Sequence, residues 1–547
     1  MTTPVLQPIT EIARTLGIPD EFLELYGRYT AKIRLDILDK TPARRGKLIL
    51  VTAMTPTKSG EGKTVNTIGL TQGLRRIGKH AVAALREPSL GPVFGVKGGA
   101  TGGGRSSVLP SDRINLHFNG DFHALTTAHN LLAALLDNSL HFGNPKRVDP
   151  NAILWPRTMD MNDRALRSVV VALGGRTNGP ARETGFVITA ASEIMAILAL
   201  ASSRDDLRAR LARIVIGFDM DGKPVTAADL EAVGSMMALL DDAIMPNLVQ
   251  TTEGAPAIIH AGPFANIAHG TSSVLAQRIG LQLADYVVNE TGFAADLGAE
   301  KFFDIVMPSC GHVPSAALVI ATIKGLRTQG EGLGASGSIP AIDAGFVNLE
   351  AHLANLARFG VPAVVAVNRF PGDTDAEVDR VLAWCREHRV AAALAEGFTR
   401  GSEGTAALAE LVVEAADRTD LSKVRPLYDA KAMSFEDKIH TIAHTVYGAT
   451  AVKYEAGAKK RLERYSALGY AHLPVCLAKT QYSISDNPAL AGAPKGWTLT
   501  VRDAVLAAGA GFVVVPLGEM QLMPGLSKSP QAVRIDVGPD GVMTGVS

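Results

Sequence analysis

The residues best suited to chemistry lie in a glycine-containing run at positions 57–64. Lys63 can place an ammonium group against the β- and γ-phosphates of a nucleotide, and the Thr64 hydroxyl can ligate Mg²⁺. Small residues before them allow backbone N–H groups to curl around phosphate oxygens. Position 57 holds threonine where the usual pattern G-x-x-x-x-G-K-S/T has glycine, so the run is a variant. The predicted phosphate-binding residues are Thr57, Lys58, Ser59, Gly60, Glu61, Gly62, Lys63 and Thr64.

The elements predicted around this run are those that a phosphate loop needs. Residues 47–54 (KLILVTAM) are almost all apolar, which is typical of a strand buried on both faces. After the run, apolar residues recur at helical spacing up to Gly78, which ends the predicted helix. Residues 80–87 then predict a second strand. This context favours nucleotide phosphate binding over an ordinary turn with a surface lysine.

A dinucleotide-binding fold is a competing interpretation, because Gly60 and Gly62 begin a G-x-G-x-x-G match. The match fails at Val65, where the third glycine belongs, and Lys63 supplies a cation that such loops do not need. Glu87 lies about where a ribose-binding acid would end the second strand. A nucleotide-binding dehydrogenase therefore stays open as a minor alternative.

The composition is that of a globular chain with material for a large core. The 547 residues are 47% hydrophobic, and 54 Lys+Arg balance 54 Asp+Glu. No charge excess indicates a nucleic acid or an anionic membrane as partner. Cys310, Cys385 and Cys476 are far apart and are expected to be buried thiols in a reducing compartment. The sequence has no signal-peptide pattern and no apolar stretch of about 18 residues, so we expect a cytoplasmic location.

The alternation of predicted helices and strands over residues 125–300 indicates an α/β fold with a doubly wound, mostly parallel sheet. A Gly/Ser/Pro-rich break at 329–345 predicts a domain boundary. We expect a P-loop nucleotide-binding domain at 1–340 and two smaller α/β domains at 341–430 and 431–547. Residues 5–40 have a helical pattern, in which Tyr26, Arg28, Tyr29 and Lys32 are expected to extend from a helix face.

Further candidate residues follow the ends of predicted strands. Arg86 ends the second strand, at the edge where parallel sheets bind ligands, so a ligand role is favoured over a structural ion pair. Phe370 and Phe398 follow successive strands and could project over one edge, although such aromatic residues more often belong to the core. Polar residues between Asp112 and His123 suit the solvent face of a short strand or, less well, a metal site.

Long blocks in one order give the whole chain a resemblance to the formate–tetrahydrofolate ligase family. They include TPTKSGEGKT, LREPSLGPVFGVKGGA, PSDRINLHFNGDFHA, GPFANIAHG, GFAADLGAEKFFDI, FGVPAVVAVNRFPGDT and LPVCLAKTQYS. The resemblance implies the reaction of ATP, formate and tetrahydrofolate to 10-formyltetrahydrofolate, ADP and phosphate through formyl phosphate, within one-carbon metabolism. It also implies a homotetramer and activation by a monovalent cation, K⁺ or NH₄⁺.

The resemblance assigns roles to residues of this sequence. It implies that Lys63 and the loop N–H groups hold the ATP phosphates, that Thr64 ligates Mg²⁺ and that Arg86 binds formyl phosphate. It places Phe293 near the adenine and Asp121 near the pterin of tetrahydrofolate. Phe370 and Phe398 match the aromatic pair that sandwiches the pterin, but Phe398 stands where the family usually has tryptophan, so less ring area stacks.

The loop and sheet alone also allow a protein of another class. A P-loop ATPase or GTPase that acts as a switch or loads a partner would share both features. A multifunctional folate enzyme is disfavoured, because 547 residues leave no room for an added dehydrogenase/cyclohydrolase domain.

Overall fold

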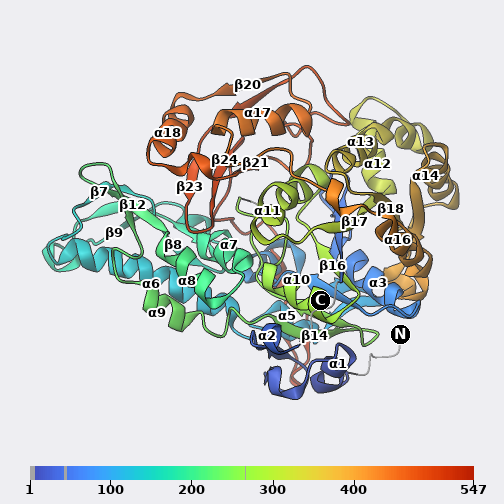
Figure 1. Cartoon of the computed structure of the whole chain (residues 1–547), viewed down its shortest axis with the longest axis horizontal. Coiled ribbons are helices and arrows are strands. Elements are labelled where there is room, and N and C mark those ends of the chain that lie inside the picture. Colours follow the sequence, from blue (N-terminus) through green and yellow to red (C-terminus); the bar gives the residue numbers. More distant parts are fainter. Residues whose placement is uncertain (1–5, 42–45, 265, 547) are drawn as a thin grey trace.

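The computed structural model describes residues 6–41, 46–264 and 266–546. Residues 1–5, at the start of the segment that lacks a signal-peptide pattern, lie outside these ranges. Strands from residues 23–109 and 247–395 form one central sheet (Figure 1). Its order is β1 (Leu23–Leu25), β2 (Ala31–Ile33), β14 (Asn247–Thr251), β15 (Pro256–Ile259), β4 (Ala81–Leu85), β16 (Tyr286–Glu290), β3 (Lys47–Ala53), β17 (Pro314–Thr322), β18 (Ala363–Asn368) and β19 (Ala391–Ala395).

The sheet is mainly parallel. Neighbours from β15 to β19 in this order all pair in parallel, whereas β1, β2 and β14 pair antiparallel at one end. The expected α/β fold with a mostly parallel sheet is therefore confirmed. Because all the parallel strands point the same way, the loops after β4, β16, β3, β17, β18 and β19 open on one edge, where ligands bind in such folds.

Helices cover both faces of the sheet, which explains why its strands are apolar throughout. In β3, Ile49 and Val51 pack on the face covered by α3 (Lys63–Arg76) and α16 (Ala406–Arg418). Leu48 and Leu50 belong to the core on the opposite face, to which α10 (Val274–Leu283) and α13 (Ser338–Arg358) contribute. Successive strand residues point to opposite faces, so neither face can be polar.

The predicted strand, loop, helix and second strand appear as β3, residues 54–62, α3 and β4. The two strands are not neighbours, because β16 lies between them. This insertion brings Glu290, the last residue of β16, to the edge beside the loop.

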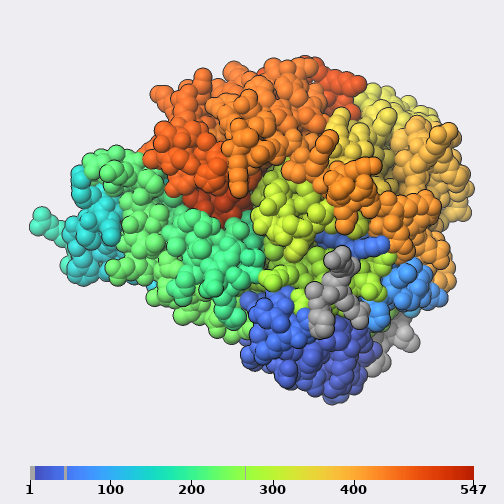
Figure 2. All heavy atoms as spheres, in the orientation of Figure 1, coloured from blue at the N-terminus to red at the C-terminus, as the bar shows by residue number. Residues whose placement is uncertain are grey.

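The central sheet crosses the predicted boundary at residue 340 without a break. Helices α12 (Ile323–Gly332) and α13 connect β17 to β18, and β18 pairs directly with β17. After residue 430 the chain forms a separate core of helices α17 (Phe435–Thr445) and α18 (Ala456–Ala467) with strands β20 (Ala451–Tyr454), β21 (Val475–Ala478), β22 (Thr498–Val501), β23 (Val505–Ala507) and β24 (Phe512–Pro516). Figure 2 shows this C-terminal unit packed along the top of the molecule. The division into domains at 340 and 430 stays a prediction.

One helix prediction is wrong, and one predicted strand belongs to a different sheet from the one expected. Residues 9–15 form helix α1 (Ile9–Thr15) as expected, but residues 23–33 form β1 and β2, and Lys32 is buried in β2 rather than extended from a helix. Pairing of β2 with β14 outweighs the local helical pattern here. The apolar run around residue 215 becomes β12 (Val215–Asp219), which joins a small antiparallel sheet with β7 (Val148–Ile153) and β13 (Pro224–Thr226) and not the central one.

The three cysteines are free thiols: Cys385 and Cys476 are buried, as expected, and Cys310 is half-buried. Within the described ranges, no helix combines the length and the apolar character needed to cross a membrane.

Candidate functional site

The loop between β3 and α3 presents backbone donors at the carboxyl edge of the sheet. Gly60 and Gly62 have φ angles of 79° and 73°, in the left-handed region that favours glycine. Gly62 precedes the first turn of α3 and has no side chain to cap that turn. The backbone N–H groups of the turn can therefore bind an anion from outside the chain. A Cβ on Gly62 would lie 2.7 Å from Asn368 Nδ2, so glycine also permits the close contact with β18.

Glu61 has an internal role within the predicted phosphate-binding run. Its buried carboxylate accepts the Thr57 N–H at 2.6 Å and the hydroxyl of Thr322 at the end of β17. Asn368 Nδ2 donates to the Glu61 carbonyl oxygen at 3.0 Å. The variant Thr57 is thus held through its amide, and the loop is fixed to β17 and β18. Lys58, Ser59 and Gly60 remain exposed.

Cations gather where β3, β4 and β16 end. Arg86 follows β4, Lys63 opens α3, and Glu290 ends β16 and accepts the Thr64 hydroxyl at 3.0 Å. Arg86 makes one long hydrogen bond, from Nη1 to the Pro263 carbonyl oxygen at 3.4 Å; Nε and Nη2 are buried, and neither has a hydrogen-bond partner within the described part of the chain.

The unsatisfied Arg86 guanidinium indicates an anion site. Burial lowers the pKa of both Arg86 and Lys63, and the attraction of Glu290 opposes this shift in each. A buried cation without a partner is costly, so an arriving anion gains more here than at an exposed site. Gly292 allows this arrangement, because a Cβ at this position would lie 2.7 Å from Arg86 Nη2.

Lys97 is a further cation of this cluster that the sequence patterns did not single out. It ends the segment Val93–Lys97 and lies close enough to Lys63 to help lower the pKa of that lysine. Its side chain is accessible, yet surrounding protein and Arg86 lower its pKa against the attraction of Glu290. The only local signal was a lysine set among glycines in GVKGGA.

Asp121 lies in a buried polar cluster rather than in an open cleft. It is 2% exposed, and its two oxygens accept Lys32 Nζ at 2.6 Å and Asn247 Nδ2 at 2.7 Å. Burial and the neighbouring Asp121 charge raise the pKa of Glu87 well above its usual range. These surroundings favour the protonated carboxyl of Glu87, which can donate a hydrogen bond at the end of β4.

Phe370 and Phe398 lie at the same sheet edge, after β18 and β19, and are 39% and 46% exposed. The alternative that they belong to the core is thus excluded. The Arg105 N–H donates to the Phe398 carbonyl oxygen at 2.8 Å. A Cβ on Gly103 would lie 2.9 Å from the Phe398 ring, so the glycine-rich segment supports this side chain.

Phe293 is half-buried with a φ of 55°, and it lines a small cleft with Lys301 and Lys479. It adjoins Gly292 and thus the Arg86 guanidinium. The interpretation of residues 112–123 as a strand face is wrong, because they contribute to α5 (Ser111–Asn115) and the start of α6 (Asp121–His141). Among residues 6–41, 46–264 and 266–546, no group of three or more His, Cys, Asp or Glu is arranged to hold a metal ion.

The fold and the site define a class: an α/β protein with a strand–loop–helix unit and a cluster of cations at the carboxyl edge of a mainly parallel sheet. The family model for formate–tetrahydrofolate ligase matches residues 2–547, and the chain belongs to that family. The family is an ATP-dependent ligase of folate-linked one-carbon metabolism.

Solved structures give weak matches. A mutant of L. casei FPGS has 9% sequence identity and a TM-score of 0.19, with 84% of this chain and 86% of that chain covered. An FPGS–AMPPCP–folate complex has 10% identity and a TM-score of 0.19, with 86% and 82% covered. At these scores neither structure bears on the fold or the function of this chain.

Proposed function

We propose that the chain ligates formate to tetrahydrofolate at the expense of ATP, through formyl phosphate, to give 10-formyltetrahydrofolate, ADP and phosphate. The observation that carries the proposal, beside the family, is the buried Arg86 guanidinium without a full set of partners, beside Lys63 and Lys97. Such a cluster suits an anion whose charge grows during reaction. Phe370 and Phe398 add an exposed aromatic pair at the same edge.

In the first step, a formate oxygen attacks the γ-phosphorus of ATP and the bond to ADP breaks. Lys63 and the N–H groups at the start of α3 hold the β- and γ-phosphates, and residues 57–62 shape the loop. Arg86 and Lys97 face the transferred phosphoryl group and the formate that it joins. Positioning and charge stabilisation are the main contributions of a protein to such a step.

Mg²⁺ fits the donors beside the loop, since the Thr64 hydroxyl and the Glu290 carboxylate offer hard oxygen ligands 3.0 Å apart. When bound with ATP, the ion would neutralise charge on the phosphate oxygens. We also propose activation by K⁺ or NH₄⁺, assembly as a homotetramer and a cytoplasmic location, because the family resemblance implies them. Neither chemical step requires them.

In the second step, N10 of tetrahydrofolate attacks the formyl carbon, and phosphate leaves with one oxygen that came from formate. Phe370 and Phe398 stack on the two faces of the pterin. The Glu87 carboxyl, next to the buried Asp121 cluster, meets polar atoms on the edge of the pterin, and Phe293 lies against the adenine. Formyl phosphate must be kept from water between the two steps.

The proposal is tested by an assay with each substrate omitted in turn. We expect 10-formyltetrahydrofolate only when MgATP, formate and tetrahydrofolate are all present, and ADP formation that depends on the other two substrates. ATP hydrolysis at the same rate without formate and folate would instead favour the P-loop ATPase or GTPase switch.

Phe398→Trp is expected to lower the KM for tetrahydrofolate about threefold to tenfold, because a larger ring stacks more area at an exposed position. The KM for ATP should stay unchanged, which steady-state kinetics with each substrate varied will show. Leu421→Trp, at another exposed apolar position, is the matched control and should change neither constant. An unchanged folate KM in Phe398→Trp would remove this ring from the pterin site.

A further inference from the structure

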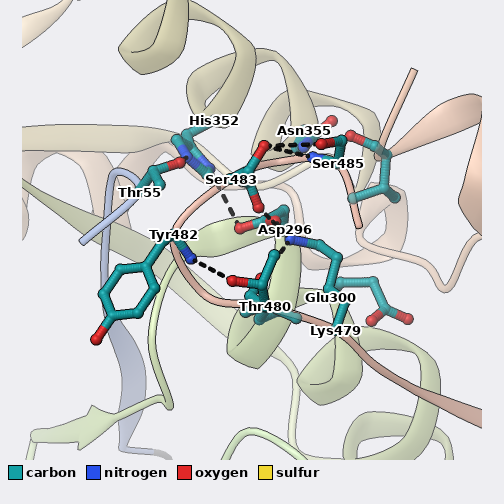
Figure 3. A network of polar contacts seen from close by, with 12 residues as sticks. Thr55, Asp296, Glu300, His352, Asn355, Lys479, Thr480, Tyr482, Ser483 and Ser485 are labelled. Atoms are coloured by element: carbon teal, nitrogen blue, oxygen red, sulfur yellow. Dashed lines mark hydrogen bonds and ion pairs between the residues drawn. The ribbon is translucent and has the colours of Figure 1, made fainter. Parts of the chain in front are cut away.

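A buried chain of polar contacts joins the C-terminal unit to Thr55, which lies two residues before the phosphate-binding run 57–64 (Figure 3). It consists of Lys479, Asp296, His352, Thr55 and Asn348, and we call it the polar relay. Lys479 follows β21 and its side chain is 0% exposed. Its ammonium forms an ion pair with Asp296 Oδ2 at 2.7 Å and donates to the carbonyl oxygens of Thr480 and Ser483 at 3.2 and 2.5 Å. The Lys479 charge is thus neutralised inside the protein.

Asp296 and His352 carry the contact onward. Asp296 lies in the segment Ala295–Ala299, just after Phe293, and its Oδ1 is 3.8 Å from His352 Nδ1 on α13, an electrostatic contact that is too long for a hydrogen bond. Burial lowers the pKa of His352 to about 4, so the ring is neutral at pH 7. The nearby carboxylate favours a proton on Nδ1, which leaves Nε2 to accept the hydroxyl of Thr55 at 3.0 Å. Figure 3 shows the His352 and Thr55 side chains pointing toward each other.

Asn348 completes the hold on Thr55. Its Nδ2 donates to Thr55 Oγ1 at 2.9 Å and to the Gly492 carbonyl oxygen of the C-terminal unit at 2.8 Å, and its Oδ1 accepts the Thr55 N–H at 3.2 Å. Thr55 therefore has both its amide and its hydroxyl fixed by α13. It precedes by two residues Thr57, whose amide is held by Glu61.

We propose that the polar relay makes Thr55 and Lys479 positioning residues for the nucleotide, so that the C-terminal unit sets how tightly loop 57–64 holds phosphate. This inference rests on the proposed ATP site. Backbone N–H groups act on a phosphate only when they are aligned before it binds. Asp296 and Lys479 neutralise each other and His352 is uncharged, so the relay acts through geometry and not through a field at the substrate.

The first test is the affinity for MgADP, measured by isothermal titration calorimetry without formate or folate. Thr55→Val keeps the shape of the side chain but removes the hydroxyl, and we expect the Kd to rise about fivefold to tenfold, the worth of one hydrogen bond. Thr55→Ser restores the hydroxyl and should restore the affinity. Thr52→Val is the matched control, because Thr52 is buried in β3, three residues before Thr55, and its hydroxyl has no hydrogen-bond partner among the described residues.

The second test acts at the far end of the relay. The double variant Lys479→Met/Asp296→Leu removes both buried charges together and so leaves neither unpaired. We expect it to raise the Kd about as much as Thr55→Val, and the triple variant to stay within about twofold of either, because coupled sites are not additive.

The outcomes separate this inference from the proposed function. Wild-type affinity in Thr55→Val, with only a lower Tm, would show that the relay merely stabilises the fold, and a multiplicative effect in the triple variant would show that its ends are independent. Both results overturn the inference alone. A wild-type protein that binds no MgADP would overturn the proposed function as well.

Discussion

Replacing Arg86 with alanine is expected to lower kcat by about 10²- to 10³-fold, the usual effect of removing one preorganised group that meets growing charge. The free energy of unfolding should stay within about 1 kcal/mol of wild type or rise, because unfolding hydrates the two buried nitrogens that the fold leaves unpaired. Single-turnover kinetics and urea unfolding measure the two quantities on the same preparation.

Arg182→Ala is the control, because Arg182 Nη1 forms an ion pair with Asp137 of α6 at 2.5 Å, outside the central sheet. It should reduce stability and leave kcat unchanged, the reverse of Arg86→Ala. Gly292→Ala is a second test of the role of Arg86, because the added Cβ would displace the guanidinium without removing its charge. This variant should also have a lower kcat. If Arg86→Ala reduces stability and retains the wild-type rate, Arg86 is a structural residue.

Lys63→Ala is expected to lower kcat about 10²-fold and to raise the KM for ATP, since the lysine meets the phosphates both before and during transfer. The KM for tetrahydrofolate should not change, because the proposed pterin contacts are Phe370 and Phe398, which follow β18 and β19, and not Lys63. Steady-state kinetics with each substrate varied will separate these effects.

The control for Lys63→Ala is Arg76→Ala, at the exposed last turn of the same helix. It should have wild-type constants within about twofold, since it is far from the phosphates and makes only surface contacts. A rise in the folate KM of Lys63→Ala equal to that for ATP would mean that the substitution distorts the whole edge and not the phosphate contact.

The loop could be predicted because its signals are local. Glycines at 60 and 62, the lysine at 63, the apolar run of β3 and the helical spacing of α3 all lie within one short stretch. Arg86 and Phe370 were predicted for the same reason, as residues that follow strands of a parallel sheet.

What sequence reasoning missed depends on contacts between distant residues. Lys32 lies in a segment with a helical pattern, yet its strand pairs with β14 and its ammonium pairs with Asp121, both far along the chain. Lys97 enters the cation cluster through a π-helical segment of 5 residues, which is too short to have a recognisable apolar spacing. Thr55, His352 and Lys479 have no motif in common, so only the folded chain brings them together.

The fate of a formate oxygen is the most direct test of the formyl phosphate route. With formate carrying ¹⁸O at both oxygens, MgATP and tetrahydrofolate, we expect each turnover to transfer one ¹⁸O atom to inorganic phosphate, because the attacking oxygen stays on phosphorus when N10 displaces the phosphate. Mass spectrometry of the released phosphate measures this transfer. Phosphate free of ¹⁸O, formed together with 10-formyltetrahydrofolate, would contradict the formyl phosphate route.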